Sequence, residues 1–266
     1  MELAKSSYYY KRKGGGFETR LVERLTRLCR KYPRYGYRRM TALLRREGWQ
    51  VNRKRIQRLM RREGLNVFTK AKKRRRLGAS TSERRRAEHA NHVWTWDFLF
   101  DRTEDGRQLK FLVIVDEYTR RSLTIRVGRC LGSREVIGEL RSLVAWHGAP
   151  GHIRSDNGSE FIAADIQRWL KSSGIRTIYI KPGSPWENPY IESFNGKFRD
   201  ECLNREMFMS ILEARVIVED WRREYNEERP HSSLGYTPPA EFARLSLPPV
   251  ATLPPAERVD MAQALT

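Results

Sequence analysis

The chain has 266 residues, a net charge of +20 and a hydrophobic fraction of 39%. Its length fits a small domain followed by a medium one. The chain has no run of eighteen apolar residues, so we predict no membrane span. Its first residues lack the apolar segment of a secretory signal, so we predict no secretion. Three scattered cysteines argue against a disulfide framework and favour a reducing cytoplasm.

The positive charge is concentrated in the first third of the chain. Residues 1–90 contain 29 lysines and arginines against 7 acids, whereas residues 91–266 contain 23 against 25. A solvated surface mixes its signs, so a one-sided excess of this size indicates a polyanionic partner, usually nucleic acid. We therefore expect a DNA-binding protein of the cytoplasm that is not associated with a membrane.

The first ninety residues divide into an arm, a helical domain and a linker. Residues 1–17 are expected to form a flexible basic arm. Residues 18–67 show apolar positions at helical spacing in three segments: Arg20–Arg30, Arg38–Arg46 and Arg53–Glu63. Gly48 is expected to stop the second helix, and Asn52 is a plausible N-cap of the third.

This arrangement, with a basic last helix, resembles a helix-turn-helix DNA-binding domain. A merely solvated basic face is the alternative interpretation. The predicted DNA contacts on the third helix are Arg53, Lys54, Arg55 and Arg58. The linker at residues 68–90 carries basic blocks of the kind that bind phosphate backbones. Its predicted contacts are Lys72, Lys73, Arg74, Arg75 and Arg76.

Residues 91–245 have the pattern of an α/β domain. Three strands come first, and then helices and strands alternate, which predicts an antiparallel meander extended by parallel strands. The result is a ribonuclease H-like, mixed five-stranded sheet with flanking helices. A last long helix begins near Pro189, a residue suited to the first helical position, with Asn188 able to cap it. The tail at residues 246–266 is rich in Pro and Ala and is expected to be disordered.

Three carboxylates stand where such a sheet can bring them together. Asp97 lies in the first strand of the domain, Asp156 follows the fourth, and Glu192 lies in the first turn of the last helix. Clustered carboxylates repel unless a cation joins them, and Mg²⁺ prefers oxygen ligands. Two such ions suit phosphoryl transfer. Other acids compete for a place in the site: Asp101, Asp116, Glu160 and Glu187.

The spacing of these acids and the sequence around them resemble a known family. Thirty-five residues separate Asp156 from Glu192, and Arg199 follows seven residues after Glu192. Three segments resemble second-frame (OrfB-type) transposases of insertion sequences: Trp-Thr-Trp-Asp97, Ser-Asp156-Asn-Gly-Ser-Glu-Phe and Asn-Pro-Tyr-Ile-Glu192-Ser-Phe-Asn-Gly-Lys-Phe-Arg199. The C-terminal Arg-Pro-His231-Ser-Ser-Leu-Gly-Tyr also matches, and the resemblance covers roughly residues 20–243. These enzymes share the D, D, E core of retroviral-type integrases.

The resemblance implies that Asp97, Asp156 and Glu192 ligate two Mg²⁺ ions, for which Mn²⁺ can substitute. Arg199 would contact DNA near the reacting phosphate, and Asn195, on the same helix face, is a further predicted DNA contact. Pairing of Arg199 with Glu192 or Asp200 is the alternative. The loop from Lys181 to Asn188 resembles a mobile active-site loop. Lys181 and Trp186 within it are predicted DNA contacts, although a packed core tryptophan is an equal alternative. His231 is expected to be structural, because metal-dependent transfer needs no histidine.

The implied activity is metal-dependent cleavage at the ends of a DNA element and strand transfer into target DNA. The resemblance further implies self-association on DNA, a first-frame (OrfA-type) partner or fusion, and a place at the bacterial nucleoid. Retroviral integrases carry a zinc domain, but this chain has no Cys-x-x-Cys, so we predict no zinc. Two other classes stay open: a non-catalytic regulator that occupies element ends, and a nuclease that cuts without joining.

Overall fold

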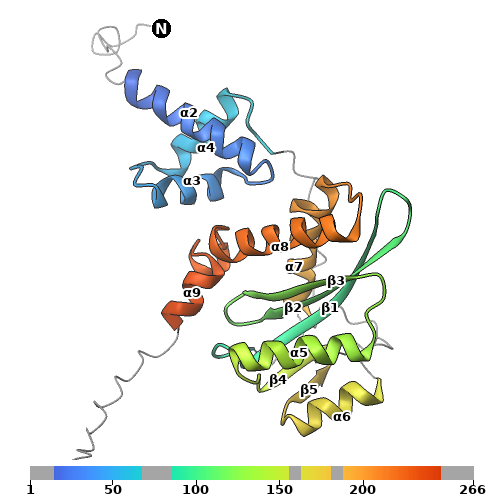
Figure 1. The fold of residues 1–266 in the computed structure, drawn as a ribbon. Coiled ribbons are helices and arrows are strands. Elements are labelled where there is room, and N and C mark those ends of the chain that lie inside the picture. Colours follow the sequence, from blue (N-terminus) through green and yellow to red (C-terminus); the bar gives the residue numbers. More distant parts are fainter. Residues whose placement is uncertain (1–14, 68–85, 156–162, 181–187, 247–266) are drawn as a thin grey trace, which may run out of the picture.

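The computed structural model describes residues 15–67, 86–155, 163–180 and 188–246 (Figure 1). Most of the arm expected at residues 1–17, most of the linker and the tail from residue 247 lie outside these ranges. Residues 15–17 of the expected arm and residue 246 of the expected tail are helical, so these two bounds were wrong. No helix of the described residues is long and apolar enough to cross a membrane. Figure 1 shows a helical domain at one end of the molecule and a sheet with flanking helices at the other.

The helical domain consists of α2 (Gly15–Lys31), α3 (Tyr37–Arg46) and α4 (Arg53–Arg62). Apolar side chains at helical spacing from all three helices form one buried cluster, which includes Leu25, Leu44 and Leu59. The predicted helix signals are confirmed. Gly48 follows α3 with a φ of 87°, which favours glycine. Asn52 caps α4, because its Oδ1 accepts a bond of 2.8 Å from the Arg55 N–H.

The second domain contains a mixed five-stranded sheet in the order β3-β2-β1-β4-β5. The strands are β1 (Val93–Arg102), β2 (Gln108–Asp116), β3 (Ser122–Gly128), β4 (His152–Ser155) and β5 (Arg176–Tyr179). Strands β1, β2 and β3 pair antiparallel, and β4 and β5 add in parallel to β1. The predicted meander with parallel additions is therefore confirmed.

Helices cover both faces of this sheet, so side chains alternate between two cores. Trp94 and Trp96 of β1 pack with α5 (Ser133–His147) and α6 (Ala164–Ser172). Leu99 of the same strand points to the opposite core. That core is completed by α7 (Pro189–Glu201) and α8 (Ile211–Glu227). The alternation directs the odd-numbered residues of β1, among them Asp97, to the face that carries α7.

Besides α8, three elements follow α7 in the described chain: η2 (Leu203–Arg205), η3 (Ser232–Leu234) and α9 (Pro239–Ser246). Helix α7 itself is held by an apolar stripe of Ile191, Phe194 and Phe198, all at most 2% exposed. The Phe198 ring lies 5.0 Å from the Trp221 ring of α8 and 5.6 Å from the Phe111 ring of β2, measured between centroids. Because these rings fix α7 on the sheet, they also fix every residue that α7 carries.

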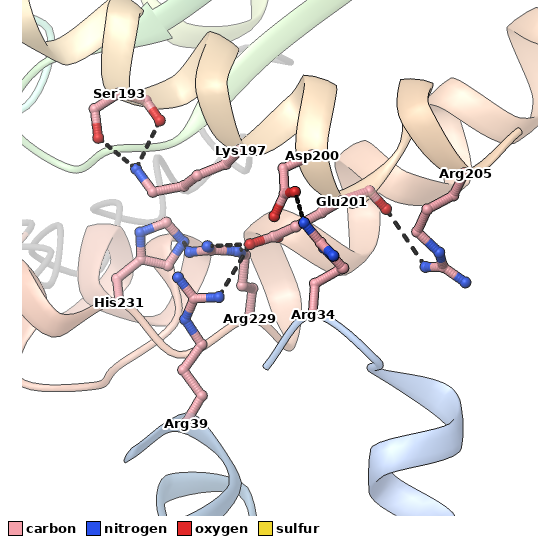
Figure 2. Close-up of polar contacts among 9 residues, drawn as sticks. All are labelled: Arg34, Arg39, Ser193, Lys197, Asp200, Glu201, Arg205, Arg229 and His231. Atoms are coloured by element: carbon pink, nitrogen blue, oxygen red, sulfur yellow. Dashed lines mark hydrogen bonds and ion pairs between the residues drawn. The ribbon is translucent and has the colours of Figure 1, made fainter. Parts of the chain in front are cut away.

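A buried ion pair lies at the end of α7. Arg229 donates two hydrogen bonds to the carboxylate of Glu201, at 2.7 and 2.6 Å (Figure 2). His231 packs beside them: its Nε2 lies 3.4 Å from Arg229 Nη1, and its ring meets the Tyr225 ring at 4.7 Å. Because Arg229 has only donors, Nε2 must be the unprotonated acceptor. Burial, with the nearby Arg229 and Lys197, lowers the pKa of His231 to about 2.

Replacement of Phe198 by alanine is expected to lower the free energy of unfolding by about 3 to 5 kcal/mol, since it leaves a cavity between α7, α8 and the sheet. Urea denaturation measures this change. Leu212→Ala is the control, because Leu212 is exposed and its truncation should cost about 0.5 kcal/mol or less. Equal effects of the two substitutions would contradict the assigned core.

The buried neutral His231 predicts a loss of stability in acid. The unfolded chain protonates this histidine below pH of about 6.5, whereas the folded chain keeps it neutral down to about pH 2. Between these values the unfolded state binds one more proton, so the free energy of unfolding falls as the pH falls. From pH 7 to 4.5 this group should remove about 2 to 3 kcal/mol.

In His231→Gln, which keeps a donor and an acceptor, that part of the acid dependence should disappear. Urea titrations of both proteins between pH 7 and 4.5 measure the difference. His89→Gln serves as the control, because His89 is exposed. An unchanged pH dependence in His231→Gln would show that the imidazole takes up a proton in the folded state.

Candidate functional site

Two side-chain contacts connect β1 to α7. The Thr95 hydroxyl donates a buried hydrogen bond of 2.6 Å to Oδ1 of Asn188. Two residues further along the strand, Oδ2 of Asp97 accepts a bond of 2.7 Å from the Asn195 amide. Asn188 occupies the N-cap position of α7, but no side-chain cap bond forms. The prediction that its side chain caps the helix is therefore wrong: the side chain bonds β1.

Glu192 lies on the same stripe of α7 as these two asparagines. It follows Asn188 by four residues and precedes Asn195 by three, which are the spacings of neighbours on one helix face. Its side chain is exposed, and the residues on either side of it along the stripe contact β1. The structure thus brings the helix face of Glu192 to the strand edge that carries Asp97.

Asp156 lies outside the described residues. Strand β4 ends at Ser155, directly before it, and pairs in parallel with β1 so that Arg154 stands beside Thr95. The end of β4 therefore lies beside the part of β1 that directly precedes Asp97. In the described part of the chain, no three His, Cys, Asp or Glu side chains lie close enough to hold a metal ion.

The competing acids have other partners or lie outside the described residues. Asp116 is 2% exposed and accepts bonds from the backbone N–H groups of Asn91 and Thr119, so it holds the turn after β2. The carboxylate of Asp101 accepts a bond from the N–H of Arg102. Glu160 and Glu187 lie outside the described ranges. The interactions of Asp116 explain its burial without any catalytic role.

Arg199 continues the stripe of Glu192 and Asn195 and is exposed. It makes no ion pair with another described residue, and the acid beside it, Asp200, pairs with Arg34 instead. The alternative in which Arg199 neutralises Glu192 or Asp200 is therefore not what the structure contains. A cation at this position is accessible to a DNA phosphate.

The predicted contacts on α4 fall into two groups. Arg55 donates to Glu18 of α2 at 3.2 Å, and Arg53 lies over the Tyr236 ring at 5.1 Å. Two others are exposed and form no ion pair with a described residue: Lys54 and Arg58. Several predicted contacts lie outside the described residues: Lys72, Lys73, Arg74, Arg75, Arg76, Lys181 and Trp186.

A cavity of about 440 Å³ opens beside the first turn of α7. Its lining includes Arg86, Arg120 and Tyr190, and the Arg120 guanidinium lies 3.9 Å from the centre of the Tyr190 ring. A third arginine in the lining, Arg154, forms a buried ion pair of 2.7 Å with Glu117. Among the described residues that line the cavity, three arginines stand against one acid, Glu117, so the lining has a net positive charge and suits an anion such as a phosphate.

Sequence reasoning did not single out the charged residues where the helical domain meets α7. Arg34 and Arg39 pair with Asp200 and Glu201, and Glu201 also pairs with Arg229. The segment that begins at Arg229 did match the family, but the resemblance assigned no function to Arg229 itself. Ion-pair partners this far apart in sequence depend on the tertiary structure.

Family models match most of the chain. Two models of the integrase core domain match residues 87–185 and 173–239, and a model of an HTH-like domain matches residues 17–75. Among solved structures, the simian T-cell lymphotropic virus intasome in complex with PP2A regulatory subunit B56 gamma is similar, with a TM-score of 0.53 and 17% identity. The match covers 88% of this chain and 79% of that one, and it supports the predicted ribonuclease H-like fold.

Proteins of insertion elements are similar along most of the chain. The IS476 uncharacterized 39.2 kDa protein of Xanthomonas euvesicatoria is 43% identical over 84% of this chain, which spans 64% of that relative, less than two thirds. The IS407 uncharacterized 31.7 kDa protein of Burkholderia multivorans is 39% identical over 91% of this chain and 87% of its own length. The putative transposase InsK for IS150 of Escherichia coli is 26% identical, over 91% and 90%. With these relatives, an integrase core and an HTH-like domain, the chain belongs to the DDE-type transposases of insertion elements.

Proposed function

We propose that this chain cleaves DNA at the ends of an insertion element and joins those ends to target DNA, with Asp97, Asp156 and Glu192 holding the metal ions. One observation carries the assignment: the contacts of Asn188 and Asn195 with β1 bring the face of α7 that bears Glu192 to Asp97. Family membership supports the same reading.

The donor set fits a hard divalent cation. An integrase core implies dependence on divalent metal, and the proposed ligands offer only carboxylate oxygens, which Mg²⁺ and Mn²⁺ prefer. Asp97 accepts hydrogen bonds from the Phe98 N–H and from Asn195, and a carboxylate oxygen can accept such a bond and ligate a cation together. Two Mg²⁺ ions held there would lower the pKa of the attacking hydroxyl and stabilise the leaving oxygen.

The proposed reaction has two steps. In the first, water attacks a phosphodiester at the element end: a bond forms from the water oxygen to phosphorus, the bond to the 3′ oxygen breaks, and a 3′ hydroxyl is released. In the second, that hydroxyl attacks a phosphodiester of the target, and the target's own 3′ oxygen leaves with the proton. Neither step needs a covalent protein–DNA intermediate.

Residues around the carboxylates have supporting roles in this proposal. Asn195 orients Asp97 through the bond of 2.7 Å. Arg199, exposed two turns beyond Glu192, contacts a phosphate near the reacting one. Lys181 and Trp186 contact the DNA end from the segment before α7, and Lys54 and Arg58 contact duplex DNA from α4, where both are exposed.

The proposal extends to assembly and location. Two element ends must be bridged, so we expect at least two copies of the chain on DNA. A first-frame partner or fusion would supply a further DNA-binding domain. The place of action is the nucleoid in the cytoplasm. The basic linker, including Lys72 to Arg76, would bind phosphates between the two domains.

Replacement of a proposed ligand should abolish catalysis and preserve DNA binding. We expect Asp97→Asn, Asp156→Asn and Glu192→Gln each to lower the rates of cleavage and joining by at least about 10³-fold, because a neutral amide is a much weaker ligand. The measurement is incubation of labelled element-end DNA with each protein and Mg²⁺ or Mn²⁺, beside a binding assay. Asp101→Asn, in the same strand as Asp97, is the matched control and should retain activity.

Full activity in any of the three variants would exclude that ligand. Cleavage without joining by the unaltered chain would favour a nuclease. Binding with no product from the unaltered chain, even after fusion to a first-frame partner, would favour a regulator that occupies element ends. Loss of activity in Asp101→Asn would indicate that Asp101, and not Asp97, is the metal ligand in β1.

Asn195→Ala should weaken metal binding, because Asp97 loses the amide that orients it. We expect about 10- to 100-fold lower activity and a higher Mn²⁺ concentration at half-saturation. Electron paramagnetic resonance titration with Mn²⁺ measures binding without catalysis. The free energy of unfolding should change by only about 1 kcal/mol.

The control for Asn195→Ala is Asn204→Ala, because Asn204 is an exposed residue of η2. Unchanged Mn²⁺ affinity in Asn195→Ala, together with lost activity, would indicate that the Asn195 amide contacts DNA and does not orient Asp97.

A further inference from the structure

The helical domain meets the catalytic domain through a set of charged contacts, here named the docking junction. In each ion pair the helical domain provides the cation and the catalytic domain provides the acid. The pairs are Arg39 with Glu201, Arg34 with Asp200, Lys31 with Glu228, and Arg46 with Glu241. Figure 2 shows Arg34 and Arg39 reaching from the helical domain to the end of α7. The two surfaces are therefore complementary in charge.

The centre of the junction is buried. Oε1 of Glu201 accepts a bond of 3.0 Å from Arg39 and one of 2.6 Å from Arg229. Glu201 and Arg229 are 7% and 1% exposed. A carboxylate shared by two guanidiniums away from water is constrained in geometry, unlike a surface pair, because any displacement leaves a buried charge without its partner.

Tyrosines add contacts at the same place. The Tyr32 hydroxyl donates to Glu228 of the catalytic domain. The Arg39 guanidinium lies 5.1 Å from the centre of the Tyr35 ring, and that of Arg229 lies 5.8 Å from it. Tyr35 is 3% exposed, so an aromatic ring of the helical domain helps to enclose the shared carboxylate. The junction therefore combines charge with burial.

One helix connects this junction to the proposed reaction centre. Glu192 lies in the first turn of α7 and Glu201 is its last residue, nine positions later. At a rise of about 1.5 Å per residue, the two carboxylates are spaced by about 13 to 14 Å along the axis. Phe194 and Phe198, between them, bury α7 in the core. The spacing is therefore set by a helix that cannot shift without disrupting the domain.

We propose that α7 acts as a spacer: the helical domain, docked on Glu201 and Asp200 of its own chain, holds DNA at a fixed distance and rotation from the bond that Asp97 and Glu192 act on. This inference rests on the proposed function for the identity of the substrate. It adds a specificity rule, because the enzyme accepts only one separation between the sequence bound by the helical domain and the site of cleavage.

The rule has a measurable consequence for DNA affinity. Two linked modules that bind together gain about 10²-fold or more over either alone, and lose that gain when the geometry forbids both. Inserting 5 base pairs between the two contact regions turns them about half a helical turn apart. We expect this insertion to weaken binding of the unaltered chain by about 10²-fold, measured in metal-free buffer so that no cleavage is needed.

The test variant is Arg34→Ala/Arg39→Ala, which removes the two cations of the helical domain that pair with Asp200 and Glu201 at the end of α7, and leaves Glu201 paired with Arg229. The helical domain can then move on its linker, so the insertion should cost less than about tenfold. Arg27→Ala/Arg30→Ala removes the same charge from exposed positions of α2 outside the junction and should keep the full penalty.

A distance measurement tests docking without DNA. Spin labels on the exposed Cys130 and on Glu23→Cys, with Cys29→Ser, report the separation of the two domains. Diluting labelled protein with an excess of unlabelled protein restricts the signal to one chain. We expect a single narrow distance distribution in the full chain and a broad one in Arg34→Ala/Arg39→Ala.

A broad distribution in the unaltered junction would overturn the proposal, as would an insertion penalty that is absent or that persists in Arg34→Ala/Arg39→Ala. A narrow distribution with a strict spacing requirement supports it, even if no cleavage is ever detected. In that case only the proposed catalytic function fails.

Discussion

The seating of α7 across β1 is the constraint on which the candidate site depends. Burial of Ile191, Phe194 and Phe198 supplies the attraction, since apolar area removed from water stabilises without specifying direction. Direction comes from the two hydrogen bonds to Thr95 and Asp97, which determine the rotation of the helix about its axis. A helix that is held in both ways presents Glu192 to the strand with little freedom.

A second requirement is the neutralisation of charge at the other end of the helix. Arg39 and Arg229 both donate to Glu201, while the Lys197 ammonium donates to Ser193 (Figure 2). Burial, followed by the nearby Arg229, lowers the pKa of Lys197 to about 8. The shared carboxylate of Glu201 makes this concentration of positive charge tolerable. The helical domain is thus joined to the catalytic domain by an electrostatic balance that neither domain has alone.

Hydrophobic periodicity explains why so much of the fold was predictable. The buried strand at Phe111, α3 and α4 were expected at nearly their observed bounds, because their apolar spacing repeats locally, whereas α2 begins at Gly15, before the expected Arg20. Helix α8 was not among the predicted elements, although Ala214, Val218 and Trp221 have helical spacing. The contact of Asn195 with Asp97, and the sharing of Glu201 by two arginines, join residues far apart in the chain, so local patterns carry no information about them.

The helical domain uses different residues for docking and for its exposed basic face. Its docking cations come mainly from α2, α3 and the turn between them, whereas Lys54 and Arg58 lie exposed on α4. Mutation can therefore alter the exposed face without disturbing the buried carboxylate. If α4 contacts DNA as proposed, a change in the sequence that it contacts would leave the attachment of the two domains unaltered.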